Sequence, residues 1–453
     1  MNPKNTIHDT HSANLVVDAA LRAQCAGRLD EAESQYRNVL RRFPEHPAAL
    51  HFLGILLHQK GQSDDGITLV RQSLGLAPEN ADWHNNLGNL LAAGQRDDEA
   101  AAAFMAALEI ESDKPIVWNN LGAVLLRADQ LENAALAFEN AIFVDPGYEE
   151  ALNNLGHVQT RQGKTVEAAL SYCAAYVVHP TPEKSKQMLG TAYYSLGRIA
   201  EAARIYRSWL DDDPGNPIAR HLLASCSGRD VPDRASDAYL EMQFDNTAQA
   251  FDSKMIGGLD YSIPEMTGRS LMALAIPAGS LAVLDAGCGT GLCGPYLAPF
   301  SKHLVGVDLS GKSLALAAEK NVYDELVKTE IVAYLTATAT RFDLLVAADT
   351  FIYFGSLDPF FQAAANALGN GGLLIASIEE CVSGADFMLN PSGRYSHRRD
   401  YVERSFAAAG FELHSVTAVD IRLELGKPAR GLFLVAKKSG SHGQFSSQRS
   451  LQN

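Results

Sequence analysis

Cysteine and positive charge are both scarce in this sequence of 453 residues. Its six cysteines are scattered without a CxxC pair, which fits neither a disulfide framework nor a zinc cluster and is typical of a reducing cytosol. The 38 lysines and arginines are outnumbered by 53 aspartates and glutamates, so the net charge is −15. Because an acidic chain repels phosphate groups, we expect no binding to nucleic acid or to anionic membranes.

Long apolar runs are missing as well. No segment approaches the ~20 apolar residues that a membrane span needs, and the polar start of the chain lacks the apolar core of a secretory signal. No cluster of metal-ligating residues stands out, so we expect no metal. With 47% hydrophobic and 20% charged residues, the composition predicts a cytoplasmic globular protein of more than one domain.

The first half of the chain repeats itself every 34 residues. The pair Leu-Gly occurs at 53–54, 87–88, 121–122, 155–156 and 189–190. Small residues, large mostly aromatic residues and prolines recur in the same phase, and Ser112 alone replaces a proline. The small residue lets two helices of a pair touch, the large one is expected to fill the space between pairs, and the proline ends the second helix.

These positions together resemble the tetratricopeptide repeat. The resemblance implies six helix pairs and a closing helix at 217–228, which form an α-solenoid with a concave groove over residues 13–230. Residues 1–12 are expected to be disordered.

Asparagine pairs lie on the expected groove wall at the same spacing. They are residues 85–86, 119–120 and 153–154. A carboxamide donates and accepts at once, so Asn86, Asn120 and Asn154 are candidates to bind the backbone of an extended peptide. The arrangement is similar to the asparagine ladder of the O-linked N-acetylglucosamine transferase superhelix, which implies a protein or peptide partner. The alternative is that asparagine before Leu-Gly is simply common in this repeat.

After residue 227 the period ends, and short β-rich runs alternate with helical segments. This alternation is typical of a parallel α/β sheet. Five strands are expected at 281–285, 303–308, within 327–335, at 342–349 and at 371–380. Two more, 411–424 and 429–438, are joined by a short loop and should form an antiparallel hairpin. The predicted second domain is therefore a seven-stranded Rossmann-like α/β domain over residues 231–437, followed by a disordered tail at 438–453.

The first strand leads into the turn LDAGCGTGLCG. Gly287, Gly289 and Gly291 allow the backbone to pass close to a ligand, whereas a dinucleotide-binding turn would need a third glycine where Leu292 stands. Asp285 enters the turn, where it could hold a cationic group. Asp308 closes the second strand, where an acid can bind ribose hydroxyls.

This turn and its two acids resemble motifs one and two of class I S-adenosylmethionine-dependent methyltransferases. The resemblance implies S-adenosylmethionine as the cofactor. It also implies cofactor contacts from Tyr261, on a segment similar to the N-terminal helix of bacterial repeat-linked methyltransferases, and from Glu330 beside the adenine. The remaining expected contacts are neighbours of these residues in the motifs, together with Asp349 at the end of the fourth strand: Ala286, Cys288, Leu309, Ile331 and Asp349. For Tyr261 and Glu330 the alternatives are a packing tyrosine and a solvated strand end.

Candidate catalytic residues follow the fourth strand and the segment GRYSHRRDYVER. Asp349 and Tyr353 are expected to face the methyl group and the acceptor, because ligands bind beyond the carboxyl ends of parallel strands. Tyr395 and His397 lie in an Arg-Tyr-x-His stretch similar to one in the repeat-linked enzymes, where a histidine could take a proton and Arg394 could hold an anion. The alternative for this stretch is a basic, solvated helix start.

The sequence thus predicts a methyltransferase with a repeat arm that recruits a protein partner or substrate. Two alternatives stay open. The enzyme could methylate a small molecule while the repeats tether it to an assembly, or the chain could be a scaffold whose cofactor domain does not turn over. The acceptor is not identified by the sequence.

Overall fold

The computed structural model describes residues 3–258, 261–382, 384–424 and 426–439. The chain forms two compact units, Met1–Thr181 and Pro182–Asn453. This division differs from the boundary at residue 230 that the sequence predicts, because the sixth helix pair and the closing helix fold with the α/β sheet.

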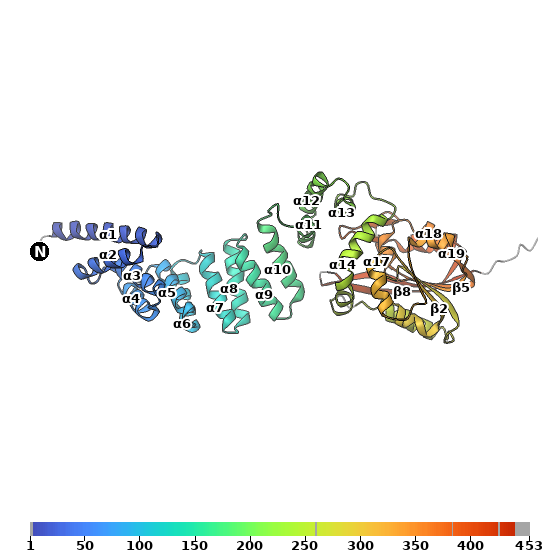
Figure 1. Ribbon diagram of the computed structural model, residues 1–453, viewed down its shortest axis with the longest axis horizontal. Coiled ribbons are helices and arrows are strands. Elements are labelled where there is room, and N and C mark those ends of the chain that lie inside the picture. The colour runs from blue at the N-terminus through green and yellow to red at the C-terminus, as the bar shows by residue number, and fades with distance from the viewer. Residues whose placement is uncertain (1–2, 259–260, 383, 425, 440–453) are drawn as a thin grey trace, which may run out of the picture. The chain divides into compact units, whose positions relative to one another are not determined.

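The first unit consists of paired helices, and Figure 1 shows successive pairs side by side. Its helices are α1 (Pro3–Cys25), α2 (Leu29–Arg42), α3 (Pro47–Gln59), α4 (Ser63–Leu76), α5 (Ala81–Ala93), α6 (Asp97–Ile110), α7 (Pro115–Arg127), α8 (Leu131–Val144), α9 (Glu149–Arg161) and α10 (Thr165–Val178). The expectation of disorder over residues 1–12 is wrong from Pro3 onwards. A proline is favourable at the first helical position, and no glycine or proline interrupts the helix that follows.

The repeat glycines explain how the two helices of a pair meet. A Cβ at Gly88 on α5 would lie 2.4 Å from the ring of Phe104 on α6, and one at Gly122 would lie 2.6 Å from Phe138. The large residue therefore packs inside its own pair, and at Tyr36 it also stacks on Phe52 of the next pair, with 6.4 Å between ring centroids. Only the missing Cβ leaves room for the ring.

The second unit begins with the sixth helix pair and the closing helix. These are α11 (Lys186–Ser195), α12 (Ile199–Asp212) and α13 (Pro217–Ser227), followed by α14 (Asp237–Gly258) and α15 (Ile263–Ala273). The closing helix is confirmed. Its Ile218 packs with Tyr239 and Leu240 of α14, so it joins the last repeat to the α/β domain.

The sheet has the order β3-β2-β1-β4-β5-β9-β8. Its strands are β1 (Leu281–Ala286), β2 (Ser301–Asp308), β3 (Glu325–Lys328), β4 (Phe342–Ala347), β5 (Leu368–Glu379), β8 (Phe411–Glu424) and β9 (Lys427–Lys438). The first five are parallel, and β9 runs antiparallel to both β5 and β8, so the terminal hairpin is confirmed. The expected tail, apart from its first residues, lies outside the described residues.

The helices between strands are short. They are α16 (Gly294–Leu297), η1 (Ala298–Phe300), α17 (Gly311–Glu319), α18 (Ile331–Ala337), η2 (Phe351–Tyr353), α19 (Asp358–Ala367) and α20 (Arg399–Ala408). The third strand was expected within 327–335; it begins earlier, at Glu325, and ends at Lys328, because Glu330 caps α18 by accepting from Ala333 N. A separate two-stranded sheet, β6 (Phe387–Leu389) and β7 (Tyr395–His397), was not predicted.

Candidate functional site

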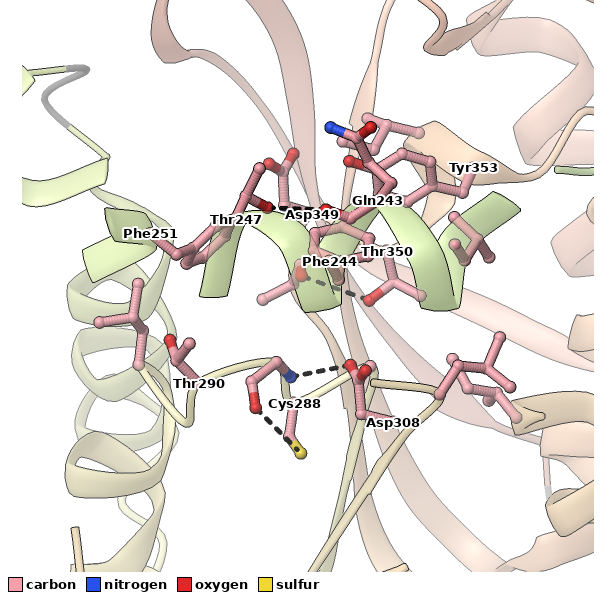
Figure 2. Close-up of a pocket in the computed structure, with 18 of the residues that line it drawn as sticks. Gln243, Phe244, Thr247, Phe251, Cys288, Thr290, Asp308, Asp349, Thr350 and Tyr353 are labelled. Atoms are coloured by element: carbon pink, nitrogen blue, oxygen red, sulfur yellow. Dashed lines mark hydrogen bonds between the residues drawn. The ribbon is translucent and has the colours of Figure 1, made fainter. Parts of the chain in front are cut away.

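A cavity of about 440 Å³ lies beyond the carboxyl ends of β1, β2 and β4. Helix α14 supplies a large part of its wall. Figure 2 shows Cys288 and Asp308 together on one side of this cavity and Asp349 and Tyr353 on the other. The cavity therefore has two distinct ends, one at the glycine turn and one at the end of β4.

The glycine turn has the backbone that the sequence predicts. Gly287, Gly289 and Gly291 have φ of +78°, +54° and +82°, which is the left-handed region that favours glycine. A Cβ at Gly287 would lie 2.7 Å from Oγ1 of Thr350, a hydroxyl that donates to the carbonyl of Ala286 at 2.8 Å. The turn is thus fixed against the end of β4, and Gly289 has open space where a side chain would be.

Asp308 anchors the same turn through the backbone. Its Oδ2 accepts from Gly289 N at 2.9 Å, and its Oδ1 accepts from Ser310 N at 2.8 Å. Burial raises the pKa of Asp308, an effect opposed by these backbone hydrogen bonds. Each carboxylate oxygen keeps a further lone pair for a ligand hydroxyl, and the side chain lines the cavity.

Asp285 is the buried acid of the site. Burial raises its pKa to about 7, although Tyr323 lowers it by donating to Oδ2 at 2.6 Å. A carboxyl group that titrates near neutral pH can ionise when a cation binds beside it.

Glu330 lies at the cavity and has one unsatisfied oxygen. Its Oε2 caps α18, whereas its buried Oε1 has no hydrogen-bond partner among the described residues. The nearest charge is Nη1 of Arg234 at 4.0 Å. The alternative of a solvated strand end is excluded, because Glu330 is a helix cap that faces the cavity.

Helix α14 is held over the turn by acids that the sequence did not single out. Asp245 accepts from Ser310 Oγ at 2.6 Å, and Asp252 accepts from Thr290 Oγ1 and from Lys320 Nζ, the latter at 2.7 Å. The same helix presents apolar and polar side chains to the cavity, among them Gln243, Phe244, Thr247 and Phe251. The spacing of the two acids by seven residues, on one helix face, was the available signal.

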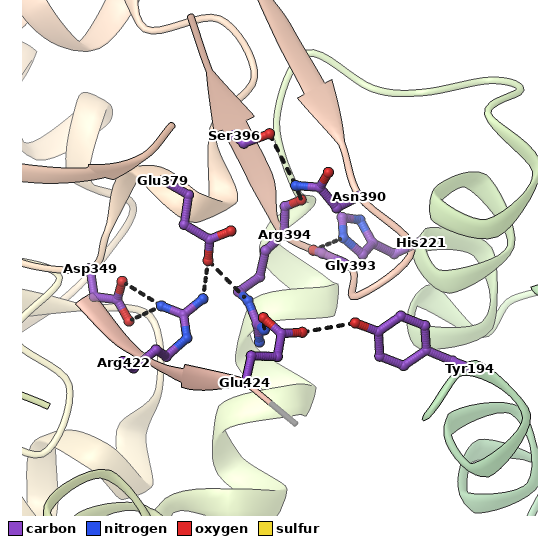
Figure 3. A network of polar contacts seen from close by, with 10 residues as sticks. All are labelled: Tyr194, His221, Asp349, Glu379, Asn390, Gly393, Arg394, Ser396, Arg422 and Glu424. Carbon is purple, nitrogen blue, oxygen red and sulfur yellow. Dashed lines mark hydrogen bonds and ion pairs between the residues drawn. The ribbon is translucent and has the colours of Figure 1, made fainter. Parts of the chain in front are cut away.

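The far end of the cavity contains a buried charge network. Asp349 accepts from Nη1 of Arg422 at 3.0 and 3.1 Å, and Nη2 of Arg422 also binds Glu379. Arg394 pairs with Glu379 at 3.2 Å and with Glu424. Figure 3 shows the network. Arg422 was missed by the sequence, because a single buried arginine near the end of a long strand carries no pattern of its own.

Two expected site tyrosines also line this end. Tyr353 contacts Phe244 edge to face at 5.4 Å between ring centroids. Burial raises the pKa of Tyr353 and of Tyr261 above the usual value, so both are neutral phenols able to donate. Of the other expected cofactor contacts, Cys288, Leu309 and Ile331 line the cavity. Ala286 and Gly291 are not among the lining residues and support the turn instead.

Tyr395 and His397 do not line the cavity, so their assignment as catalytic residues is wrong. Tyr395 is fully buried and donates to the carbonyl of Pro232 at 2.7 Å. Nε2 of His397 lies 2.7 Å from the carbonyl of Phe354 and 3.1 Å from that of Gly355, so this nitrogen carries the proton. Burial lowers the pKa of His397 to about 4, and the ring holds the chain in place rather than accepting a proton from a substrate.

The asparagines of the ladder in the first unit bond to side chains of the preceding helix pair. Nδ2 of Asn120 donates to Asn85 at 3.2 Å, and Nδ2 of Asn154 donates to Asn119 at 2.9 Å. Nδ2 of Asn86 lies 3.1 Å from Nε2 of His51. Each bond joins neighbouring helix pairs, so these side chains connect successive repeats. None of these bonds uses the Oδ1 atom of Asn86, Asn120 or Asn154.

Comparison with known proteins gives two family matches. Residues 284–376 match the methyltransferase domain family, and residues 17–78, 59–115, 119–185 and 188–227 match the tetratricopeptide repeat family. The chain therefore consists of tetratricopeptide repeats followed by a methyltransferase domain, as the sequence resemblance implied.

Individual relatives cover only parts of the chain. The ubiquinone biosynthesis O-methyltransferase of Chelativorans sp. strain BNC1 is 28% identical over 163 residues, which are 32% of this chain and 64% of that protein. Among solved structures, MamA from Desulfovibrio magneticus RS-1 covers 38% of this chain and 97% of its own, at 20% identity and a TM-score of 0.36. Magnesium protoporphyrin IX methyltransferase (ChlM) from Synechocystis PCC 6803 with bound SAH covers 39% and 82%, at 17% identity and a TM-score of 0.31. The chain thus spans less than two thirds of the first curated relative.

Neither a membrane-spanning helix nor a metal-binding cluster is present among the described residues. No helix in that part of the chain is long and apolar enough to cross a membrane. No group of three or more His, Cys, Asp or Glu side chains within it is placed to hold a metal ion.

Proposed function

We propose that the second unit transfers a methyl group from S-adenosylmethionine to an acceptor that enters at the Asp349 end of the cavity. The observation that carries this proposal is the convergence of the glycine turn, Asp308 and the unsatisfied Oε1 of Glu330 on one wall. These groups fit the cofactor, since Asp308 could accept from two ribose hydroxyls and Glu330 from the adenine amine. Asp285 would lie near the cationic methionine part.

The bound cofactor would supply an activated methyl group on a sulfonium. The chain's own task is then alignment of acceptor and methyl group, which accounts for much of the rate in such reactions. Tyr353 and Tyr261 would orient the acceptor by donating hydrogen bonds. Both oxygens of Asp349 already accept from Arg422, so we assign Asp349 to holding this end of the cavity in shape.

The acceptor class is open to a direct test. Relatives named as O-methyltransferases support oxygen as the first acceptor atom to examine. Purified protein is incubated with methyl-labelled S-adenosylmethionine and an extract of the source cells, and the label is separated into protein and small-molecule fractions. Titration calorimetry with S-adenosylmethionine, S-adenosylhomocysteine and NAD measures cofactor choice. Tight NAD binding without binding of the other two ligands would overturn the proposal.

We further propose that the first unit recruits a protein or peptide partner through its groove. The repeat family supports this role, as do the Oδ1 atoms of Asn86, Asn120 and Asn154, which accept no hydrogen bond within the described part of the chain. Partner capture by wild-type protein and by the combined variant Asn86→Ala, Asn120→Ala, Asn154→Ala, compared by mass spectrometry, tests it. Identical partners for both proteins would favour the alternative of asparagines that serve only the repeat. Label that enters small molecules alone would favour a tethering role.

A further inference from the structure

The sixth helix pair contacts the charge network at the acceptor end of the cavity. Tyr194 on α11 donates a hydrogen bond to Oε1 of Glu424 at 2.8 Å, and Oε2 of Glu424 pairs with Nη2 of Arg394. Figure 3 shows Tyr194 approaching Glu424 from the repeat side, with Arg394 beyond it. Residues 188–227 match the tetratricopeptide repeat family, so a repeat residue is two contacts away from a cavity-lining arginine.

The network between Tyr194 and the cavity is continuous. Arg394 pairs with Glu379, Glu379 with Arg422, and Arg422 with Asp349. Arg394, Arg422 and Asp349 all line the cavity. Three acids face two arginines, so the charges of this group do not cancel, and Glu424 is the acid farthest along the chain of contacts from Asp349. Its position depends on Arg394 on one side and on the Tyr194 hydroxyl on the other.

The segment that carries Arg394 is also held by the closing helix. Nε2 of His221 on α13 lies 2.8 Å from the carbonyl of Gly393. The same ring stacks on Tyr239 of α14 with 3.9 Å between centroids. Both the backbone before Arg394 and its side-chain partner are therefore fixed by elements that precede the α/β sheet.

We propose that Tyr194 is a positioning residue that holds Arg394, through Glu424, in the orientation that the acceptor meets. This proposal rests on the proposed methyl transfer and adds to it a role for the last repeat at the acceptor site. Without the hydroxyl, Glu424 loses one hydrogen bond to a charged group and Arg394 loses a fixed partner, whereas the cofactor wall at Asp308 is unchanged.

The test compares Tyr194→Phe with Tyr193→Phe in the full chain. Tyr193 is the neighbouring buried residue on α11, and its ring contacts Arg198 at 4.8 Å rather than the network. Both variants are assayed with labelled S-adenosylmethionine against a dilution series of the extract fraction that the wild type labels. Tyr194→Phe is expected to raise the half-saturating fraction concentration about threefold to thirtyfold. S-adenosylhomocysteine affinity should stay within about twofold of wild type for both variants.

The results separate failure of this inference from failure of the proposed function. Equal half-saturation for the wild type and Tyr194→Phe would overturn the inference. If the wild type transfers no label, the proposed function fails. Hydrogen exchange of peptides covering 390–397 then decides the inference, since faster exchange in Tyr194→Phe alone supports it and equal exchange in both variants overturns it. If Tyr194→Phe does not fold, Glu424→Ala removes the acceptor of the same hydrogen bond and is assayed in its place.

Discussion

Replacing Asp308 by alanine tests the cofactor wall most directly. In the structure the two carboxylate oxygens accept from Gly289 N and Ser310 N, and a bound cofactor would add ribose hydroxyls to the same oxygens. Hydrogen bonds to a charged group contribute about 1.5–3 kcal/mol each. Loss of two ribose contacts should therefore weaken S-adenosylhomocysteine binding by about a hundredfold to ten-thousandfold.

The same substitution also leaves two backbone donors without their acceptor. Each unsatisfied buried group costs about 1–3 kcal/mol, so Asp308→Ala should lower the melting temperature as well as the affinity. Asp343→Ala is the matched control, because Asp343 also accepts from a backbone N–H, that of Ala282 at 2.9 Å, and does not line the cavity. It should lower stability and leave the affinity unchanged.

Affinity is measured by titration calorimetry at a temperature where each variant is folded by circular dichroism. If folded Asp308→Ala binds S-adenosylhomocysteine within about twofold of wild type, Asp308 does not contact the cofactor. An equal loss of affinity in Asp343→Ala would show that the effect comes from general destabilisation.

Three further predictions concern Asp285, the asparagine ladder and the domain boundary. The pKa of Asp285 is raised from 3.8 to about 7 in the folded protein, so protonation of this carboxyl group stabilises the fold. This stabilisation is complete below the unfolded pKa and is lost as pH rises through about 7. Melting of the unliganded protein should show this loss of stability, which is about 4 kcal/mol, and Asp285→Asn should abolish the pH dependence. The affinity for S-adenosylmethionine should rise over the same pH range in the wild type only. The triple variant Asn86→Ala, Asn120→Ala, Asn154→Ala should lose about 2–6 kcal/mol of unfolding free energy in urea, because four hydrogen bonds between helix pairs disappear. An unchanged midpoint would show that these bonds contribute nothing. Removal of residues 1–181 should leave a folded, cofactor-binding protein, whereas removal of residues 1–230 exposes Tyr239 and should give a lower melting temperature. Equal melting temperatures of the two fragments would contradict the division at Thr181.

Local sequence patterns were sufficient to predict the structure wherever a residue's role depends on its near neighbours in the sequence. The 34-residue period predicts the helix pairs, and the prolines predict the ends of the second helices. In the other half, the order of apolar runs predicts the terminal hairpin. The glycine turn between β1 and α16 is likewise local, and its three positive φ angles follow from the residue type.

The errors concern residues whose surroundings come from distant parts of the chain. His397 and Tyr395 carry the chemistry of a catalytic pair, yet they are buried and bind carbonyls at 354–355 and 232. Glu330 lies on a predicted strand, but the chain turns into a helix there and leaves one carboxylate oxygen facing the cavity. Sequence alone gives no means of deciding which side of a strand or loop a polar residue will face.

The sequence by itself determined the repeat architecture, the α/β class and the acids around the glycine turn, because each depends on spacing along the chain. Only the tertiary structure decided where the second unit begins. Tyr194 and His221 belong to the repeat pattern but bind Glu424 and Gly393, which are about 230 and 172 residues away. The tertiary structure also assembled one buried network from Asp349, Glu379, Arg394 and Arg422. Such contacts depend on packing between elements, and burial makes each charge need a partner that no local motif specifies.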